Sequence, residues 1–507
     1  MNDLLFGAVQ HGGGLAMAAA QAFPVWKRRL SEQYGLTTGS IDIAHYERSA
    51  GQSFSSSEDA AFHYLARGSA RGWSPQPGFS PDEYRRDNPD TVVAGYEPFA
   101  HWLRFGRAEG RGAVAPADPP IPDMRVLLER GRPDGVHATV DVVVPVHGGR
   151  ALALQAIASV LEATPREACE LVVVDDASPD PLLRAELQAL AAAGLVTLLV
   201  NARNIGFVGS VNRGIDLHPD RDVVLLNSDA RVFGNWLDRL VAALRTPRTA
   251  TATPFSNAAT ILSYPATLCE NRLPADGDVV QWDRLCAASQ SPLVEIPTAV
   301  GFCMAIRRSC LHQIGPFNQE RFGRGYGEEN DFCLRATAAG WRHVAVPGLF
   351  VWHRGGTSFG NQRRELIAAA QVTIEALHPG YAAAVGRFIQ EDPLEPARRA
   401  LDIARIRGDR RPKRLRLGAT GIPGTTDAID IDLVADLPPY AGQFRLVAKG
   451  IGPTPNLPRC RPSMSSPELA GLFEQLGIQE FSEGRARAAS GAWGGRIRRA
   501  MELIGAA

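Results

Sequence analysis

Short apolar runs alternate with amphipathic segments between about residues 140 and 226. The runs are rich in Val and Leu and cover residues 140–146, 171–174, 195–200 and 223–226. Between the first two runs, Leu154, Ile157 and Leu161 recur at helical spacing, and an Ala/Leu-rich segment follows at about 181–193. Strands that are apolar on both faces and separated by helices are typical of a parallel sheet with helices on both sides. The pattern therefore predicts an α/β fold with a mostly parallel sheet sandwiched by helices.

An internal repeat precedes this region. His63-Tyr-Leu recurs 38 residues later as His101-Trp-Leu, and the same offset relates further pairs. Those pairs are Gly68 and Gly106, Gly72 and Gly110, Tyr46 and Tyr84, and Ile41 and Phe79. Each unit is predicted to be a short helix with an aromatic face, and stacked units of this kind bury a shared core. We predict a small helical repeat module with a packing role or a role in docking a protein partner.

Changes in composition divide the chain into five predicted parts. An N-terminal extension (1–37) and the repeat module (38–113) come before a proline-rich linker (114–137). The α/β domain follows at 138–400, and an appended region of unknown role covers 401–507. That region carries strand-like runs at 414–417, 429–434 and 444–448.

Composition and charge narrow the class of protein. Lys+Arg and Asp+Glu number 54 each, so no overall field attracts nucleic acid, and we expect no nucleic-acid partner. The 7 cysteines are scattered without a Cys-x-x-Cys pair, which argues against a zinc ribbon or a disulfide framework and favours reduced thiols in the cytoplasm. No apolar run approaches about 18 residues, so we expect no membrane span. The Ala-rich stretch 12–23 has no basic segment before it, and we expect no signal peptide.

Polar or glycine-rich residues follow each of the predicted strands, at the end where ligands bind to parallel sheets. In chain order they are Pro145 and His147, Asp176, then Asn204, Gly206 and Asn212, then Asn227 and Asp229. The first strand is not followed by Gly-x-Gly-x-x-Gly, and Gly-x-x-x-x-Gly-Lys-[Ser/Thr] does not occur, which argues against a dinucleotide oxidoreductase and a P-loop NTPase. Asp176 suits a hydrogen bond to a base or ribose, and Asp229 suits a divalent cation that neutralises a diphosphate.

Residues 138–360 resemble the family 2 glycosyltransferases, whose catalytic domain has the GT-A fold. The matching segments are Val140-Asp-Val-Val-Val-Pro-Val-His147, Glu170-Leu-Val-Val-Val-Asp-Asp176, Asn204-x-Gly206 through Asn212-Arg-Gly214, Leu225-Leu-Asn-Ser-Asp229, Gly301 with Arg307, Gly327-Glu-Glu-Asn-Asp331 through Arg335, and Val351-Trp-His353 through Ser358. The resemblance implies an inverting hexosyl- or deoxyhexosyltransferase with a nucleotide-diphosphate sugar as its donor. It implies a glycan or lipid-linked glycan as the acceptor, in the synthesis of O-antigen or another bacterial surface polysaccharide. Contact with the inner membrane would then be peripheral, from the cytoplasm.

The resemblance also implies a role for each residue at the strand ends. Asp229 and His353 would hold a divalent cation, Mn2+ or Mg2+. Asn227 stands where the family's Asp-x-Asp motif has its first acid, and the literal copies Asp220-Arg-Asp222 and Asp430-Ile-Asp432 lie elsewhere in the chain. The residues that would contact the base or shape the donor loop are Pro145, His147, Asp176, Asn204, Gly206 and Asn212.

Glu328, Glu329 and Asp331 open a predicted helix that ends at Gly340. Acids in a first turn complement the helix dipole, which explains one or two of the three. By the resemblance, Glu329 is the general base that deprotonates the acceptor hydroxyl, while Glu328 and Asp331 lie on the acceptor side. Aspartate is the commoner residue at the position of the base.

Two alternatives stay open. A nucleotidyltransferase on a similar sheet would carry a Gly-rich loop with a basic residue after the first strand, which His147-Gly-Gly-Arg150 resembles only weakly. The other is a catalytically degenerate protein that binds sugar nucleotides or serves as a scaffold, and Asn227 and Glu329 are the departures that suggest it.

Overall fold

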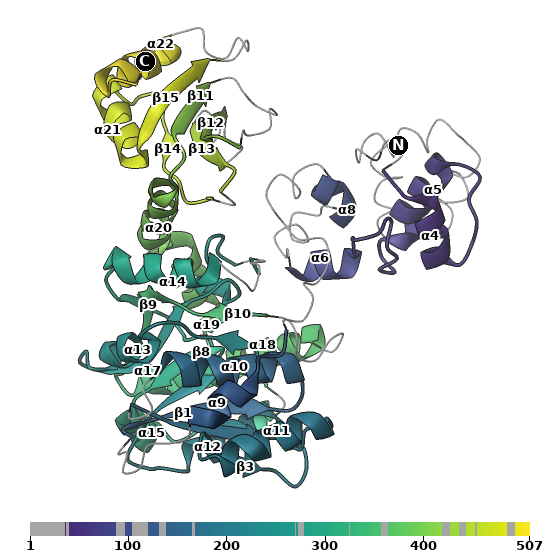
Figure 1. Ribbon diagram of the computed structural model, residues 1–507, viewed down its shortest axis with the longest axis vertical. Coiled ribbons are helices and arrows are strands. Elements are labelled where there is room, and N and C mark those ends of the chain that lie inside the picture. Colours follow the sequence, from purple (N-terminus) through teal and green to yellow (C-terminus); the bar gives the residue numbers. More distant parts are fainter. Residues whose placement is uncertain are drawn as a thin grey trace. The chain divides into compact units, whose positions relative to one another are not determined.

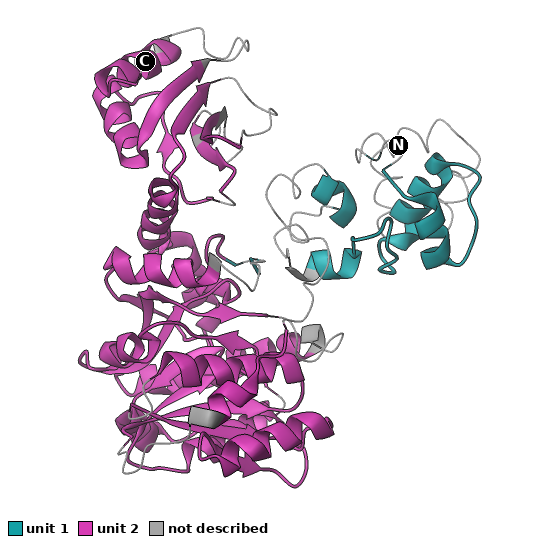
Figure 2. Ribbon diagram, viewed as in Figure 1, with its two compact units in different colours: residues 1–117, 268–272 teal, residues 118–267, 273–507 magenta. Residues whose placement is uncertain are grey.

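The computed structural model of the 507-residue chain describes residues 36, 40–87, 97–103, 120–130, 138–164, 168–268, 270–271, 278–323, 325–355, 363–417, 426–435, 443–451, 454–483 and 492–506. The chain divides into two compact units, residues 1–117 with 268–272, and residues 118–267 with 273–507 (Figure 2). The predicted extension at 1–37 lies outside the described residues except for Leu36.

An eight-stranded sheet lies at the centre of the larger unit, in the order β3-β2-β1-β4-β8-β6-β9-β7 (Figure 1). Its strands are β1 (Val140–Val146), β2 (Glu170–Asp175), β3 (Thr197–Val200), β4 (Asp222–Leu226), β6 (Thr249–Phe255), β7 (Val294–Ile296), β8 (Cys303–Ile306) and β9 (Arg342–Phe350). β1 to β4 are parallel, whereas β8 runs antiparallel between β4 and β6, and β7 runs antiparallel to β9. The predicted α/β fold with a mostly parallel sheet is confirmed, and the sheet is mixed.

Each face of the sheet buries alternate residues of the central strands. Val142 and Val144 of β1 lie in one apolar core and Val143 in another. The first core includes residues of α10 (Arg150–Ala163), α11 (Pro181–Ala192), α13 (Trp236–Leu244) and α14 (Asp278–Ser289), and the second includes residues of α12 (Gly206–Ile215), α15 (Arg308–Ile314), α16 (Gln319–Phe322) and α17 (Glu328–Ala338). A Cβ on Gly214 would lie 2.4 Å from Val143 Cγ1, so glycine lets α12 pack directly on β1.

The predicted burial on both faces does not extend to β3. Its residues are partly exposed, and Val200 keeps 50% of its surface in solvent. β3 has a neighbour on one side only, since it is the edge of the sheet next to β2. An apolar run alone does not distinguish a central strand from an edge strand.

The segment predicted as a proline-rich linker contains a helix, α9 (Met124–Arg130). Met124 and Leu127 are buried and belong to the same apolar core as Val142. Their spacing places both on one helical face, which explains why this part of the predicted linker packs against the α/β domain. Residues 104–119 and 131–137 lie outside the described part of the chain.

A short two-stranded sheet joins β5 (Ala230–Arg231) to β10 (Trp352–His353), just beyond the ends of β4 and β9. Three helices follow it: α18 (Arg363–Leu377), α19 (Tyr381–Glu391) and α20 (Glu395–Gly408). No helix among the described residues is both long and apolar enough to cross a membrane.

The C-terminal region forms a second sheet in the order β14-β13-β12-β11-β15. Its elements are β11 (Lys413–Leu417), β12 (Ile429–Ala435), β13 (Phe444–Lys449), β14 (Arg459–Cys460), α21 (Ser466–Leu476), β15 (Ile478–Glu483) and α22 (Ala492–Leu503). Leu415 and Ile431 share an apolar core with residues of α21 and α22. Asp432, from the literal Asp-x-Asp copy, is buried in ion pairs with Arg416 and Lys449.

In the smaller unit, the repeat detected in the sequence is also a repeat of contacts. Its helices are α4 (Ile43–Ala50), α5 (Ser57–His63), which continues as a π-helix (Tyr64–Gly68), α6 (Pro81–Asp87) and α8 (Pro98–His101). The Tyr46 hydroxyl lies 2.9 Å from His63 Nδ1, and the Tyr84 hydroxyl lies 2.8 Å from His101 Nδ1. The same tyrosine–histidine hydrogen bond therefore recurs at the offset found in the sequence. Gly106 and Gly110 lie outside the described residues.

Candidate active site

Asp229 and His353 meet at the carboxyl end of β4. Asp229 directly precedes β5, and His353 pairs with Ala230 across the short sheet of β5 and β10. His353 Nε2 lies 3.2 Å from Asp229 Oδ1, and both side chains are largely buried. The sheet thus joins two predicted metal ligands that are far apart in the sequence.

The tautomer of His353 follows from its second contact. Its Nδ1 lies 2.7 Å from the carbonyl oxygen of Ala258, which can only accept a hydrogen bond, so Nδ1 carries the proton. In a neutral ring, Nε2 then presents a lone pair toward a carboxylate oxygen. Two acceptors at this distance need a cation between them or a second proton on the ring. A histidine whose other nitrogen is fixed by a backbone carbonyl is the usual arrangement of a metal ligand.

Asn227 completes this group. Its side-chain oxygen is buried without a hydrogen-bond partner among the described residues, and its Nδ2 lies 3.5 Å from His353 Nε2. A buried amide oxygen without a partner costs about 1–3 kcal/mol, so a ligand for it is expected. The amide oxygen, the Asp229 carboxylate and the imidazole form an O,O,N donor set that fits Mn2+ or Mg2+.

A single loop, residues 256–264 (the 256–264 loop), holds the backbone of His353. Asn257 Nδ2 donates to the His353 carbonyl oxygen at 2.7 Å, and the His353 N–H donates to Asn257 Oδ1 at 2.9 Å. On the other side, the ring of Phe302 stacks on the imidazole with centroids 5.1 Å apart. Asn257 was not found from the sequence, because an isolated asparagine in a loop carries no signal of its partner.

Glu328 and Glu329 begin α17, as predicted. Gly327 precedes them with φ +91°, and a Cβ there would lie 3.0 Å from the Phe322 ring. One carboxylate oxygen of each glutamate is buried without a hydrogen-bond partner within the described chain. Burial raises the pKa of both carboxyl groups, and the charge of Glu329 raises the pKa of Glu328 further. A carboxylate with a raised pKa is suited to accept a proton near neutral pH.

The turn at 301–302 links this pair to the group around His353. A Cβ on Gly301 would lie 3.9 Å from Glu329, whereas the next residue, Phe302, stacks on His353. The carbonyl oxygen of Phe302 also accepts a hydrogen bond of 2.8 Å from the N–H of Asn227. The base predicted from the sequence and the predicted metal ligands therefore flank the same turn.

Asp176 organises the predicted donor loop. Its Oδ1 accepts hydrogen bonds from Asn201 Nδ2 (2.9 Å) and from the N–H of Ile205 (2.8 Å), and its Oδ2 accepts one from the N–H of Gly206 (2.9 Å). Gly206 starts α12 with φ +84°, a conformation that favours glycine. Most of the hydrogen-bonding capacity of Asp176 is thus used inside the protein, and its contact with a base stays a prediction.

His147 and Asn204 lie together beside this loop. His147 Nδ1 is 2.8 Å from the carbonyl oxygen of Asp176, and Asn204 Nδ2 lies 3.0 Å from His147 Nε2. Pro145 lies in β1 next to Val174 of β2. The structure therefore brings His147, Asp176 and Asn204 together beyond the carboxyl ends of neighbouring strands.

The side chains of two further predicted site residues make contacts within the fold. The side chain of Asn212 binds the carbonyl oxygen and the N–H of Phe317, at 2.8 and 3.1 Å. Asp331 is almost fully buried and pairs with Arg335 and His378, each at 2.8 Å. Both side chains bind neighbours in space that the sequence pattern does not identify, and their roles on the donor side (Asn212) and the acceptor side (Asp331) stay predictions.

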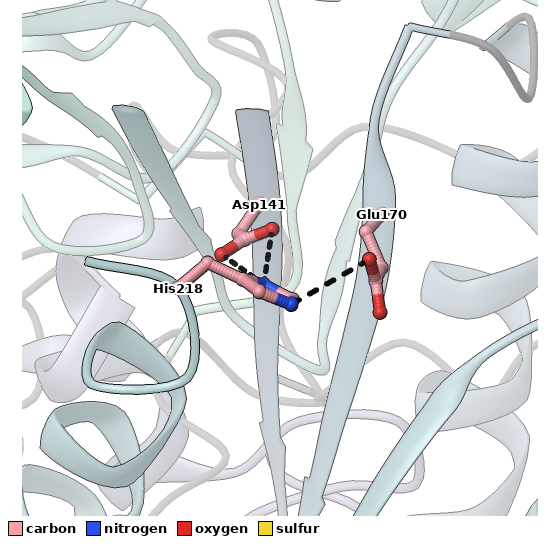
Figure 3. Close-up of side chains that lie close together, drawn as sticks. All are labelled: Asp141, Glu170 and His218. Atoms are coloured by element: carbon pink, nitrogen blue, oxygen red, sulfur yellow. Dashed lines mark hydrogen bonds and ion pairs between the residues drawn. The ribbon is translucent and has the colours of Figure 1, made fainter. Parts of the chain in front are cut away.

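A different cluster of Asp, Glu and His lies at the amino end of the sheet. Asp141 of β1, Glu170 of β2 and His218 offer ligand atoms within 4.8 Å of one another, a spacing that could hold a metal ion (Figure 3). Arg221 Nη1, however, lies 3.0 Å from Asp141 and 2.7 Å from Glu170. Burial raises the pKa of Glu170, but contacts with Thr197, Arg221 and His218 outweigh it and leave the pKa below its usual value. This cluster is a compensated ion-pair network.

Comparison with known proteins identifies a family for part of the chain. Residues 141–315 match the model of Glycosyl transferase family 2. This part of the chain is therefore a family 2 glycosyltransferase domain with a GT-A-like fold. A search of curated proteins gives no match to the chain.

Solved glycosyltransferase structures are similar at low identity. One is GalNAc-T7 with UDP, GalNAc and Mn2+, with 21% identity over 42% of this chain and 43% of that chain, and a TM-score of 0.34. Another is the mannosyltransferase PcManGT from Pyrobaculum calidifontis in complex with GDP-Man and Mn2+, with 16% identity over 64% of this chain and 88% of that chain, and a TM-score of 0.34. This chain thus spans less than half the length of the first.

Proposed function

We propose that the chain is an inverting glycosyltransferase that moves a hexosyl or deoxyhexosyl group from a nucleotide-diphosphate sugar to a hydroxyl of a glycan or lipid-linked glycan. We further propose that it acts in the cytoplasm, at the periphery of the inner membrane, in the synthesis of a bacterial surface polysaccharide. The observation that carries the enzymatic part is the turn at 301–302. It is flanked by Glu329, whose carboxylate has one buried oxygen and a raised pKa, and by the Asp229–His353 pair.

In the proposed mechanism, Glu329 accepts the proton of the acceptor hydroxyl while that oxygen attacks the anomeric carbon of the donor. A single displacement of this kind inverts the configuration at that carbon. General-base catalysis by a positioned carboxylate accounts for about 10²–10⁴ of the rate. The raised pKa of Glu329 makes its carboxylate a stronger base than a solvated glutamate.

Asn227, Asp229 and His353 would hold a divalent cation, which would supply charge to offset the leaving diphosphate. Asp176 keeps the 201–206 segment in place through three hydrogen bonds, so that the backbone around Gly206 is fixed before the donor binds. Preorganisation of this kind reduces the entropy that a loop loses on binding.

Of the two alternatives, the nucleotidyltransferase has the weaker support. Its phosphate loop would need Arg150, whose guanidinium instead pairs with both carboxylate oxygens of Glu186. One observation favours the degenerate binding protein: Asn227, a neutral residue, lies at the proposed metal site. A site with fewer negatively charged ligands binds a divalent cation more weakly.

A donor hydrolysis screen tests the proposal. The full chain is incubated with UDP-, GDP- and dTDP-sugars, with Mn2+ or with a chelator, and nucleotide release is measured. We expect slow hydrolysis of one donor class that depends on Mn2+. Tight binding of that donor by calorimetry with no hydrolysis and no transfer to any acceptor would favour the degenerate binding protein instead.

A further inference from the structure

The 256–264 loop has contacts at both of its ends. It follows β6 and closes on itself, since the Ser256 N–H donates to the carbonyl oxygen of Leu262 (3.2 Å) and the Tyr264 N–H donates to that of Ser256 (2.8 Å). Near its start, Asn257 and Ala258 hold the backbone and the imidazole of His353. What fixes the end of the loop therefore also affects the orientation of His353.

The end of the loop is fixed by the C-terminal part of the chain. The Tyr264 hydroxyl is buried and donates to Asp402 Oδ1 of α20 at 2.8 Å. Asp402 Oδ2 accepts hydrogen bonds from the N–H and the Nδ2 of Asn456, at 2.9 and 3.0 Å. Asn456 Nδ2 also donates to the carbonyl oxygen of Pro265 at 2.9 Å, so the same two residues hold the chain on both sides of the Tyr264–Pro265 bond.

The surroundings of Asp402 are closed to solvent. The guanidinium of Arg405 lies 3.5 Å from Asp402 Oδ1, donates to the carbonyl oxygen of Ile451 at 2.7 Å and stacks 4.5 Å above the Trp282 ring. The Tyr264 ring packs edge-on against Trp282 with centroids 5.1 Å apart. A fully buried acid with this many partners has one well-defined arrangement, because any displaced partner would leave a polar group unsatisfied.

We propose that Asp402 is a positioning residue for the metal-ligand histidine. It fixes Tyr264, Tyr264 fixes the 256–264 loop, and the loop presents His353 Nε2 toward Asp229. The appended C-terminal region thereby takes part in building the catalytic site instead of being only attached to it. This inference rests on the role of His353 in the proposed function.

The experiment compares Tyr264→Phe and Asp402→Asn with wild type in the full chain. Tyr264→Phe removes only the hydroxyl and keeps the ring packing. Asp402→Asn replaces one acceptor oxygen of the carboxylate with an amide NH2, which cannot accept the hydrogen bonds that Asn456 and Tyr264 donate to the carboxylate. Asp432→Asn is the matched control, because Asp432 is an equally buried acid of the C-terminal sheet whose ion pairs with Arg416 and Lys449 do not reach the loop.

The first readout is the affinity for Mn2+ alone, measured by calorimetry. Loss of an outer partner of a metal ligand typically weakens binding about 10–100-fold. We expect about 10-fold weaker Mn2+ binding in Tyr264→Phe and at least as much in Asp402→Asn, with activity restored at saturating Mn2+. Asp432→Asn should lower stability but keep the Mn2+ affinity of wild type. Wild-type affinity in both test variants, or an equal loss in the control, would overturn the inference.

The second readout is amide hydrogen exchange in the metal-free protein, followed at His353 and in peptides of the 256–264 loop. We expect faster exchange at both places in Tyr264→Phe and not in Asp432→Asn. If wild type binds no Mn2+, the metal part of the proposed function fails, and the exchange data still decide the inference. Unchanged exchange in Tyr264→Phe would show that Asp402 does not act on His353 through the loop.

Discussion

Similar residues lie at the amino ends of the central strands (the amino edge) and at their carboxyl ends (the carboxyl edge). The two places differ in the partners of those residues. At the amino edge, Asp141 and Glu170 lie beside His218. At the carboxyl edge, Asp229 lies beside His353, with Glu329 across the 301–302 turn. By residue type and spacing alone, both edges could hold a metal ion.

The difference lies in what completes the contacts of each carboxylate. At the amino edge, Arg221 bridges Asp141 and Glu170, so the protein itself supplies the positive charge. At the carboxyl edge, the described residues leave buried oxygens of Asn227 and Glu329 without a partner. Buried polar atoms are rarely left unsatisfied unless a ligand or a reaction uses them. At these two places the partners of the carboxylates, and not the residue types, separate the proposed site from the ion-pair network.

The largest effect should come from Asp229→Ala. Loss of the carboxylate removes the charged oxygen ligand from the proposed cation site. A metal ion contributes several kcal/mol to the stabilisation of charge on the donor, so we expect Mn2+-dependent donor binding to fall by about 10²-fold or more. The fold should persist, because the side chain lies beyond the end of β4. Calorimetry with Mn2+ and a sugar nucleotide measures the loss.

Asp222→Ala is the matched control on the same strand. Asp222 begins β4 at the amino edge, where its Oδ1 accepts the N–H of Arg308 at 2.8 Å. We expect a small loss of stability and unchanged donor binding. Equal losses of Mn2+-dependent binding in Asp222→Ala and Asp229→Ala would mean that the two edges do not differ as described.

Glu329→Gln should have the next largest effect. The amide keeps the shape of the side chain and cannot take a proton, so we expect turnover to fall about 10²–10⁴-fold with little change in donor affinity. Turnover of wild type should fall on acidification through a pKa above 4.5, because burial raises the pKa of Glu329 and protonation inactivates it. Steady-state rates between about pH 4 and 8 measure both effects.

Glu328→Gln separates the two neighbours, and we expect a milder loss of turnover that keeps the acidic limb of the pH profile. A Glu329→Gln enzyme within a few-fold of wild type would rule out Glu329 as the base. A defect confined to donor binding would instead place Glu329 on the metal side.

Breaking the ion-pair network at the amino edge should lower the stability of the fold and leave turnover and donor binding unchanged. Arg221→Gln removes the guanidinium that lies 3.0 Å from Asp141, which is 0% exposed, and leaves the His218 ring at 3.0 Å. Removing one partner of a buried ion pair costs about 3–5 kcal/mol, so we expect the free energy of unfolding to fall by about 3 kcal/mol. Urea denaturation measures this free energy. The control is Arg245→Gln, because Arg245 is exposed. Additional Mn2+ binding in Arg221→Gln would show that the acids of this edge can hold a cation once the guanidinium is removed.

How far the sequence predicts this molecule depends on whether the signal is local. The runs at β1, β2 and β4 are predictable because both faces of each strand are buried, so each apolar residue is needed. The antiparallel direction of β8 between β4 and β6 is not predictable in this way. Strand direction depends on how the chain crosses from one strand to the next, and no local pattern encodes that crossover. Likewise, an apolar run does not show that β3 lies at an edge.

The same holds for the site. Asp229 and Glu329 stand in motifs that place them at a strand end and a helix start, and the structure puts them there. Asn212 and Asp331 stand in motifs too, yet their side chains are occupied by Phe317 and by Arg335 and His378. Which polar side chain is left unsatisfied depends on distant neighbours, and the sequence alone does not contain that information in readable form.

The smallest expected effect is that of removing residues 1–115, which lie before the first donor-side residue and within the smaller compact unit. That unit has its own aromatic core around Tyr46 and Phe99, while the described core residues around the donor-site strands and helices belong to the larger unit. We therefore expect the shortened chain to fold and to bind the sugar nucleotide with a Kd within about two-fold of wild type, measured by calorimetry under the same Mn2+ concentration. A shortened chain with an intact melting transition and no donor binding would show that the repeat module contributes to the donor site, and the contrast between the two edges of the sheet would then not account for donor recognition.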